Sequence, residues 1–91
     1  MVNIIKVTND KYVIDFGYDE IIIVADYDKS PTGKILWKVS SECVNRYGLT
    51  GHKCCNKNFN KLIEYVISSV EVCCENMLSR IKAYKNENNQ I

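Results

Sequence analysis

The sequence has no apolar run that approaches the ~20 residues of a membrane-spanning helix, and its first six residues are too short an apolar stretch for a signal peptide. We therefore expect no membrane contact and a cytoplasmic location, which would be the host-cell cytoplasm if the chain comes from a phage or a virus. Because that compartment is reducing, the five cysteines are expected to be free thiols.

Signatures of catalysis are also missing. The single histidine, His52, is the only candidate base for a cysteine nucleophile. It lies two positions from Cys54 in the same loop, so its ring could not easily reach across to the thiol. No glycine-rich segment could hold a phosphate, and the acidic residues fall in expected turns or on expected solvent faces and form no buried pair. We therefore predict that the protein is not an enzyme, with no catalytic residues and no cofactor.

The cysteines lack the C-x2-4-C spacing from which structural zinc sites are usually built. We expect no metal site; the alternative is a zinc-stabilised interaction module. For Cys73 the simpler interpretation is a small core residue. Cys54 and Cys55 precede the expected helix, whose N-terminal dipole could lower the pKa of their thiols. The residues that a zinc site would combine are Cys43, His52, Cys54 and Cys73.

Proline occurs once, and it lies with a glycine in the clearest loop of the chain, residues 28–33. Around that loop, short segments rich in β-branched and aromatic residues predict strands at residues 3–7, 12–16, 21–27 and 34–40. Ninety-one residues allow one domain. We divide it into a β-meander (1–40), a loop rich in Gly, Cys and basic residues (41–57), a long helix (58–85) and a frayed tail (86–91).

The last third of the chain carries apolar residues three or four positions apart, the spacing of one helical face. Asn56 or Asn58 is the expected N-cap. The predicted fold class is α+β, with an antiparallel four-stranded meander and one long C-terminal amphipathic helix packed across one face. The stripe consists of Phe59, Ile63, Val66, Val70, Cys73, Met77, Ile81 and Tyr84.

Such a helix would be about 40 Å long, whereas a strand of five or six residues spans only about 17–20 Å. The sheet should therefore leave the far end of the helix uncovered. We predict a homodimer that buries this end, although packing against the chain's own sheet would use the same stripe. The expected dimer interface consists of Met77, Leu78, Ile81 and Tyr84.

The net charge of +1 conceals an uneven distribution, acidic from residue 10 to 28 and basic from residue 29 to 61. The acidic segment predicts a protein partner with basic residues, such as a nucleic-acid-handling host complex. The partner-binding residues would be Asp15, Asp19, Glu20, Asp26 and Asp28.

The basic segment supports an alternative, a small nucleic-acid-binding protein, because lysines can contact phosphates and an aromatic ring can stack on a base. The scarcity of arginine, present only as Arg46 and Arg80, argues against it. The residues concerned would be Lys34, Lys38, Arg46, Tyr47, Lys53 and Lys57.

The preferred hypothesis is a small non-enzymatic protein-interaction module that acts by direct binding. Its length and its Lys-, Asn- and Ile-rich composition, typical of AT-rich genomes, are similar to those of small phage or mobile-element proteins that inhibit a host defence nuclease, such as anti-CRISPR proteins. The similarity involves size and composition and no shared motif. It implies that the acidic residues would meet basic residues of the target.

Overall fold

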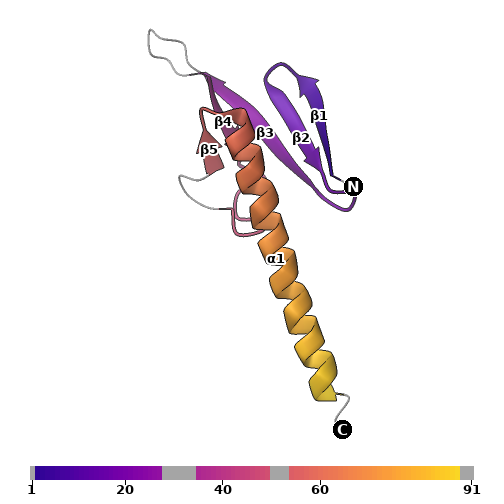
Figure 1. Cartoon of the computed structure of the whole chain (residues 1–91). Helices are drawn as coiled ribbons and strands as arrows, with labels where there is room; N and C mark the ends of the chain where they lie inside the picture. The colour runs from indigo at the N-terminus through magenta and orange to yellow at the C-terminus, as the bar shows by residue number, and fades with distance from the viewer. Residues whose placement is uncertain (1, 28–34, 50–53, 89–91) are drawn as a thin grey trace.

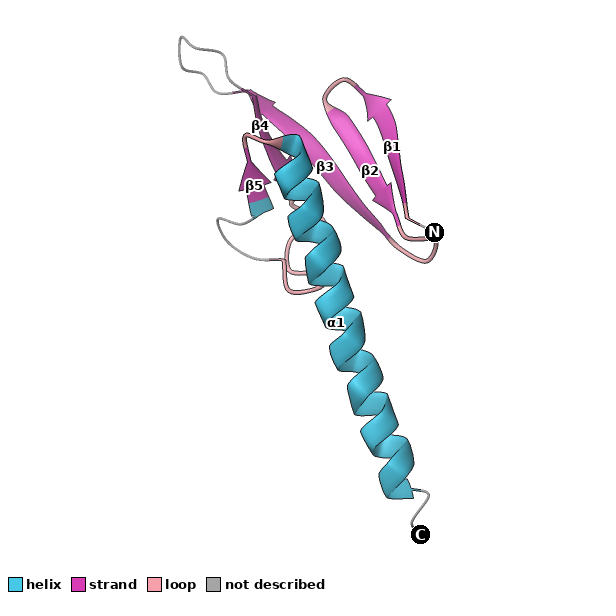
Figure 2. Ribbon diagram, viewed as in Figure 1, coloured by secondary structure: helices cyan, strands magenta, loops and turns pink. Residues whose placement is uncertain are grey.

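The computed structural model describes residues 2–27, 35–49 and 54–88. They form one antiparallel sheet and one long helix, which confirms the predicted α+β class. The strands follow one another across the sheet in chain order, and the helix lies over one side of it (Figures 1 and 2). The elements are β1 (Asn3–Thr8), β2 (Lys11–Asp15), β3 (Glu20–Tyr27), β4 (Ile35–Val39), β5 (Cys55–Asn56) and α1 (Phe59–Asn88).

The four expected strands are present, and β5 is an addition to the predicted meander. This strand pairs with β4 and lies within the segment for which we predicted a loop, residues 41–57. It has only two residues, which is too short to show the alternation of apolar and polar side chains that identifies a strand. Loop residues 28–33 and Lys34, the first residue of the expected fourth strand, lie outside the described part of the chain.

Cross-strand pairing brings the apolar residues of one sheet face into register. Ile14 pairs with Ile21, and Ile23 pairs with Val39, so all four side chains lie on the same face. Helix α1 covers this face with Leu62, Ile63 and Val66, and most of these side chains are fully buried. Ile35, the first residue of β4, is in alternation with Trp37 and Val39 but is 38% exposed.

An aromatic cluster joins the start of α1 to the sheet. The ring centroid of Phe59 lies 4.7 Å from that of Tyr12 and 5.0 Å from that of Trp37, and the Tyr12 and Trp37 centroids are 5.5 Å apart. Asn58 caps the helix, because its Oδ1 accepts a hydrogen bond from the Lys61 amide at 3.2 Å. These contacts anchor the N-terminal half of α1 on the sheet.

The C-terminal half of α1 leaves the sheet. Val70 is the last buried residue of the helix, and every described side chain from residue 74 to 87 is exposed. The radius of gyration is 16.7 Å, compared with about 12 Å for a compact domain of this length. The helix therefore projects from the body (Figure 1). It ends at Asn88 rather than Lys85, so residues 86–88 of the predicted frayed tail are helical.

Candidate functional site

The acidic residues expected to bind a partner do not form one free acidic surface. An Asp26 carboxylate oxygen lies 3.2 Å from Nζ of Lys38, and an Asp19 oxygen lies 3.4 Å from Nη1 of Arg46. Asp15 accepts a hydrogen bond from the amide of Gly17 in the turn that follows β2. Glu20 begins β3, and Asp28 lies outside the described residues.

The same contacts occupy part of the basic set. Lys38 and Arg46, two residues of the nucleic-acid alternative, are the partners in the ion pairs just described. The Tyr47 hydroxyl donates a hydrogen bond to the Asp19 carboxylate, and Lys57 is exposed. Lys34 and Lys53 lie outside the described residues. The acidic and basic segments of the sequence thus partly neutralise each other once the chain folds.

The contact between Tyr47 and Asp19 ties the turn after β4 to the turn before β3. The two oxygens are 2.5 Å apart, and Asp19 also accepts a hydrogen bond from the Glu20 amide. The Tyr47 hydroxyl, the Glu20 amide and the Arg46 guanidinium lower the pKa of Asp19. The hydrogen bond to Asp19 also raises the pKa of Tyr47 to about 12.

Tyr47→Phe removes this hydrogen bond and should change how stability depends on pH. The pKa of Asp19 is lower in the folded than in the unfolded chain. The contribution of this carboxylate to the free energy of unfolding is therefore present at neutral pH and is lost as the pH falls through the folded pKa. The contribution of Tyr47 is lost as the pH rises from about 10 toward about 12. We expect the variant to be less stable at pH 7, with the difference vanishing at both extremes.

Urea unfolding across the pH range measures this difference, and NMR titration of the Asp19 carboxyl should show a higher pKa in Tyr47→Phe. Tyr18→Phe is the matched control, because Tyr18 neighbours Asp19 and is fully exposed. An Asp19 pKa equal in Tyr47→Phe and in the wild type would show that the hydroxyl does not stabilise the carboxylate.

Two of the five cysteines belong to the core, and Cys74 is exposed. Cys43 and Cys54 are buried in the core, and Cys43 Sγ accepts a hydrogen bond from the Ile22 amide at 3.4 Å. Cys73, expected to be a core residue, is only half-buried on α1 and does not belong to the core. His52 lies outside the described residues. Within the described part of the chain, no three His, Cys, Asp or Glu side chains come together as metal ligands would. Burial, with the nearby Cys55, raises the pKa of Cys54, which corrects the expectation of a lowered value.

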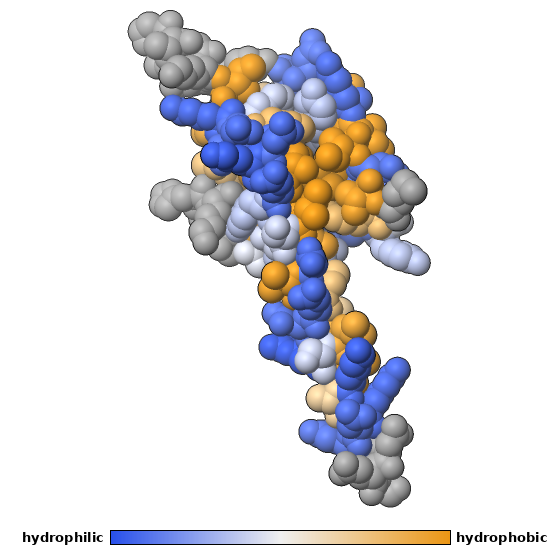
Figure 3. All heavy atoms as spheres, viewed as in Figure 1, coloured by the Kyte–Doolittle hydropathy of each residue, from blue (hydrophilic) through white to orange (hydrophobic). Residues whose placement is uncertain are grey.

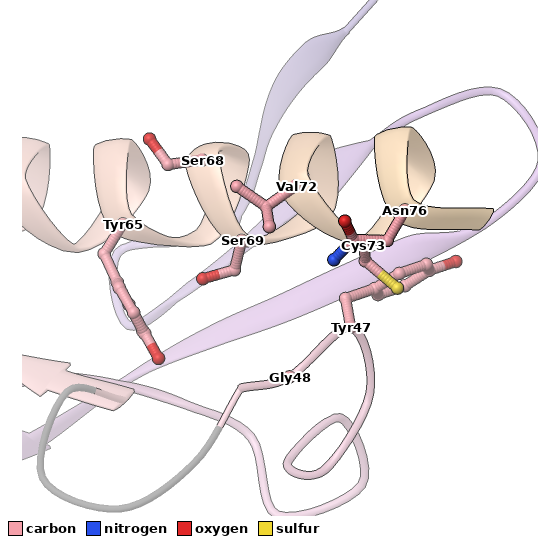
Figure 4. Close-up of a pocket in the computed structure, with 8 residues that line it drawn as sticks. All are labelled: Tyr47, Gly48, Tyr65, Ser68, Ser69, Val72, Cys73 and Asn76. Carbon is pink, nitrogen blue, oxygen red and sulfur yellow. The ribbon is translucent and has the colours of Figure 1, made fainter. Parts of the chain in front are cut away.

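A groove of about 490 Å³ separates the segment after β4 from one flank of α1 (Figure 4). Residues 40–49 form successive turns held by backbone hydrogen bonds, and the buried side chains of Cys43 and Leu49 fix them to the core. Tyr47 has a φ of 53°, an uncommon conformation for a residue other than glycine. The groove lining combines small polar groups with aromatic rings: Tyr47, Gly48, Tyr65, Ser68, Ser69, Val72, Cys73 and Asn76.

The sequence did not identify this groove. Ser68, Ser69, Val72 and Asn76 recur at helical spacing, which marks one flank of α1, but the segment that faces them showed no regular pattern. The positive φ of Tyr47 has no sequence signature either, since tyrosine seldom takes that conformation.

The projecting half of α1 carries an exposed apolar stripe. This stripe continues the buried stripe of the anchored half. Figure 3 shows hydrophobic side chains (orange) among hydrophilic ones (blue) along it. The four residues predicted to form the dimer interface all lie here. Their side chains are exposed by 55% (Met77), 51% (Leu78), 45% (Ile81) and 68% (Tyr84).

Strand β1 is a second exposed apolar element. It lies at one edge of the sheet, and none of its residues is buried. Val2, Ile4, Ile5 and Val7 are exposed by 44% to 52%. A register shift between Lys6 and Thr8 interrupts its pairing with β2, and such irregularities help to protect edge strands from further pairing.

Comparison with protein-family models, with curated proteins and with solved structures gives no match. Among the helices of the described residues, none combines the length and the apolar character that crossing a membrane requires.

Proposed function

We propose that the protein is a non-enzymatic interaction module that acts by direct binding through the projecting half of α1. The observation that carries this proposal is the apolar stripe of Met77, Leu78, Ile81 and Tyr84, which remains exposed in the single chain. Scattered apolar residues are normal on protein surfaces. A continuous stripe on a helix that extends beyond its own domain is typical of an interaction surface.

The continuity of the stripe supports the same proposal. Met77 and Ile81 follow Ile63, Val66 and Val70 at helical spacing, so a surface that is core in the first half of α1 becomes solvent-exposed in the second half. Removing this area from water would contribute about 25 cal/mol per Å². The stripe stays exposed in the single chain, so a partner that covers it would provide this free energy of burial.

The inhibitor hypothesis adds a host defence nuclease as the target. It remains a prediction from size and composition. The fold gives the acidic residues a smaller role than the hypothesis assigned to them, because Asp19 and Asp26 already have basic partners within the chain. The nucleic-acid alternative is weakened for the same reason, since Arg46 and Lys38 are those partners.

Ile81→Glu tests the proposal because it places a charge in the exposed stripe without touching the core. We expect it to abolish both self-association in sedimentation velocity and capture of a partner from native-host extract, while the circular dichroism spectrum stays unchanged. Ser79→Glu is the control: it adds the same charge to an exposed position of α1 outside the stripe. If Ile81→Glu associates as strongly as wild type and Ser79→Glu do, the stripe is not the binding surface.

A further inference from the structure

We infer that the projecting half of α1 binds a second copy of this chain, with the two helices antiparallel and a two-fold axis near Leu78. This inference rests on the proposed function and adds to it the partner and its orientation. It is carried by the charges beside the stripe, which change sign along the helix. Glu71 and Glu75 lie near the body, and Lys82 and Lys85 lie near the end.

These four charges lie on one side of α1. At 3.6 residues per turn they fall within an arc of about 80°, and this arc also contains Leu78. All four side chains are exposed. This arc adjoins the apolar stripe at Leu78. Lys85 and Glu71 lie nearest to the stripe, and Lys82 and Glu75 lie farther round the helix from Met77.

The four charges have no ion-pair partner in the chain's described part. The ion pairs there join Asp26 to Lys38 and Asp19 to Arg46, and both lie in the body. Glu71 and Glu75 are one turn apart, as are Lys82 and Lys85, so each pair places like charges together. Like charges at this spacing destabilise an isolated helix slightly. Opposite charges from another molecule would offset this cost.

Antiparallel pairing brings those opposite charges together. A two-fold axis at Leu78 places residue 71 of one copy opposite residue 85 of the other, and residue 75 opposite residue 81, next to Lys82. Each glutamate thus meets a lysine, and two-fold symmetry repeats both pairs. Parallel pairing would instead align Glu71 with Glu71 and Lys85 with Lys85. The charge pattern therefore selects the antiparallel arrangement.

The apolar residues and the length of the helix fit the same axis. Met77 and Leu78 of the two copies meet at the centre, and Ile81 of each copy lies near Cys74 of the other. Residue 86 of one copy reaches residue 70 of the other, and Val70 is the last buried residue of α1. The partner helix would thus cover the segment that the sheet leaves exposed.

Charge reversal tests the inference by sedimentation equilibrium at low salt, where exposed charges interact most strongly. In Glu71→Lys/Glu75→Lys, and separately in Lys82→Glu/Lys85→Glu, four attractive pairs per dimer become repulsive. We expect each double variant to self-associate at least tenfold more weakly than wild type. An equimolar mixture of the two should form a heterodimer, in which all four pairs are again opposite in sign.

The quadruple variant, which combines all four reversals, is the matched control. It has the same net charge as wild type and restores every antiparallel pair with the signs exchanged, so it should dimerise as wild type does. All four positions are exposed, and unchanged circular dichroism would verify folding. Double variants that associate as strongly as wild type, or a quadruple variant that stays monomeric, would overturn the antiparallel arrangement.

Two outcomes separate this inference from the proposed function. If dimerisation is lost in Ile81→Glu but is insensitive to charge reversal, the stripe is the binding surface and the antiparallel arrangement is wrong. If wild type is monomeric at every concentration, the second copy is not the partner. If wild type then captures a protein from extract and Ile81→Glu does not, the stripe binds a different protein.

Discussion

Leu62→Ala is expected to lower the free energy of unfolding by about 3 kcal/mol, whereas Leu78→Ala is expected to change it by less than about 0.5 kcal/mol. Both substitutions remove the same atoms from the same helix. Leu62 is fully buried between α1 and the sheet, and Leu78 is 51% exposed on the projecting half. The loss at Leu62 combines a lost transfer free energy with a cavity that the packed core cannot fill.

A loss of about 3 kcal/mol is a large part of the 5–15 kcal/mol that stabilises a typical domain. Urea unfolding at low micromolar protein concentration measures both variants, and dilution keeps the contribution of any dimer small. Equal losses at the two positions would mean that Leu78 is as well packed within one chain as Leu62.

Truncation after Glu75 is expected to abolish self-association completely while the body still unfolds cooperatively. The truncated chain retains all buried residues of α1, up to Val70, and loses Met77, Leu78, Ile81 and Tyr84. The removed side chains, from residue 76 to the end of the described helix, are exposed wherever the structure describes them, so little core stabilisation should be lost.

A chain that ends at Glu87 is the control, because it keeps the whole stripe. Sedimentation velocity measures association, and thermal unfolding monitored by circular dichroism measures cooperativity. If truncation after Glu75 leaves the body unfolded, the second half of α1 is needed for folding, and the division between an anchored and a projecting half is wrong.

The helix and the strands could be predicted because each has a local, repeating pattern. The stripe from Phe59 to Tyr84 indicated a helix longer than the sheet, and segments rich in β-branched and aromatic residues indicated β1 to β4. β5 could not be predicted, since two residues carry no pattern. Ile35 fits the alternation of β4, but its place at the end of the strand leaves it exposed.

The contacts at the site depend on parts of the chain that are far apart in sequence. Asp19 meets Arg46 and Tyr47 across 27 and 28 positions, so the sequence showed the charges but not their pairing. The groove beside Tyr47 requires the path of residues 40–49, which has no repeating pattern. The change of charge sign from Glu71 to Lys85 is visible in the sequence, but it becomes informative once Val70 is known to be the last buried residue of α1.

Amide hydrogen exchange, measured at increasing protein concentration, tests most directly whether the projecting half of α1 is an association surface. We predict that amides of residues 74–87 exchange quickly in dilute protein and become protected as the protein concentration rises. The amides of Ile14 and Ile23 in the core should be protected equally throughout. Protection of residues 74–87 that is already complete in dilute, monomeric protein, or that never increases with concentration, would contradict the account.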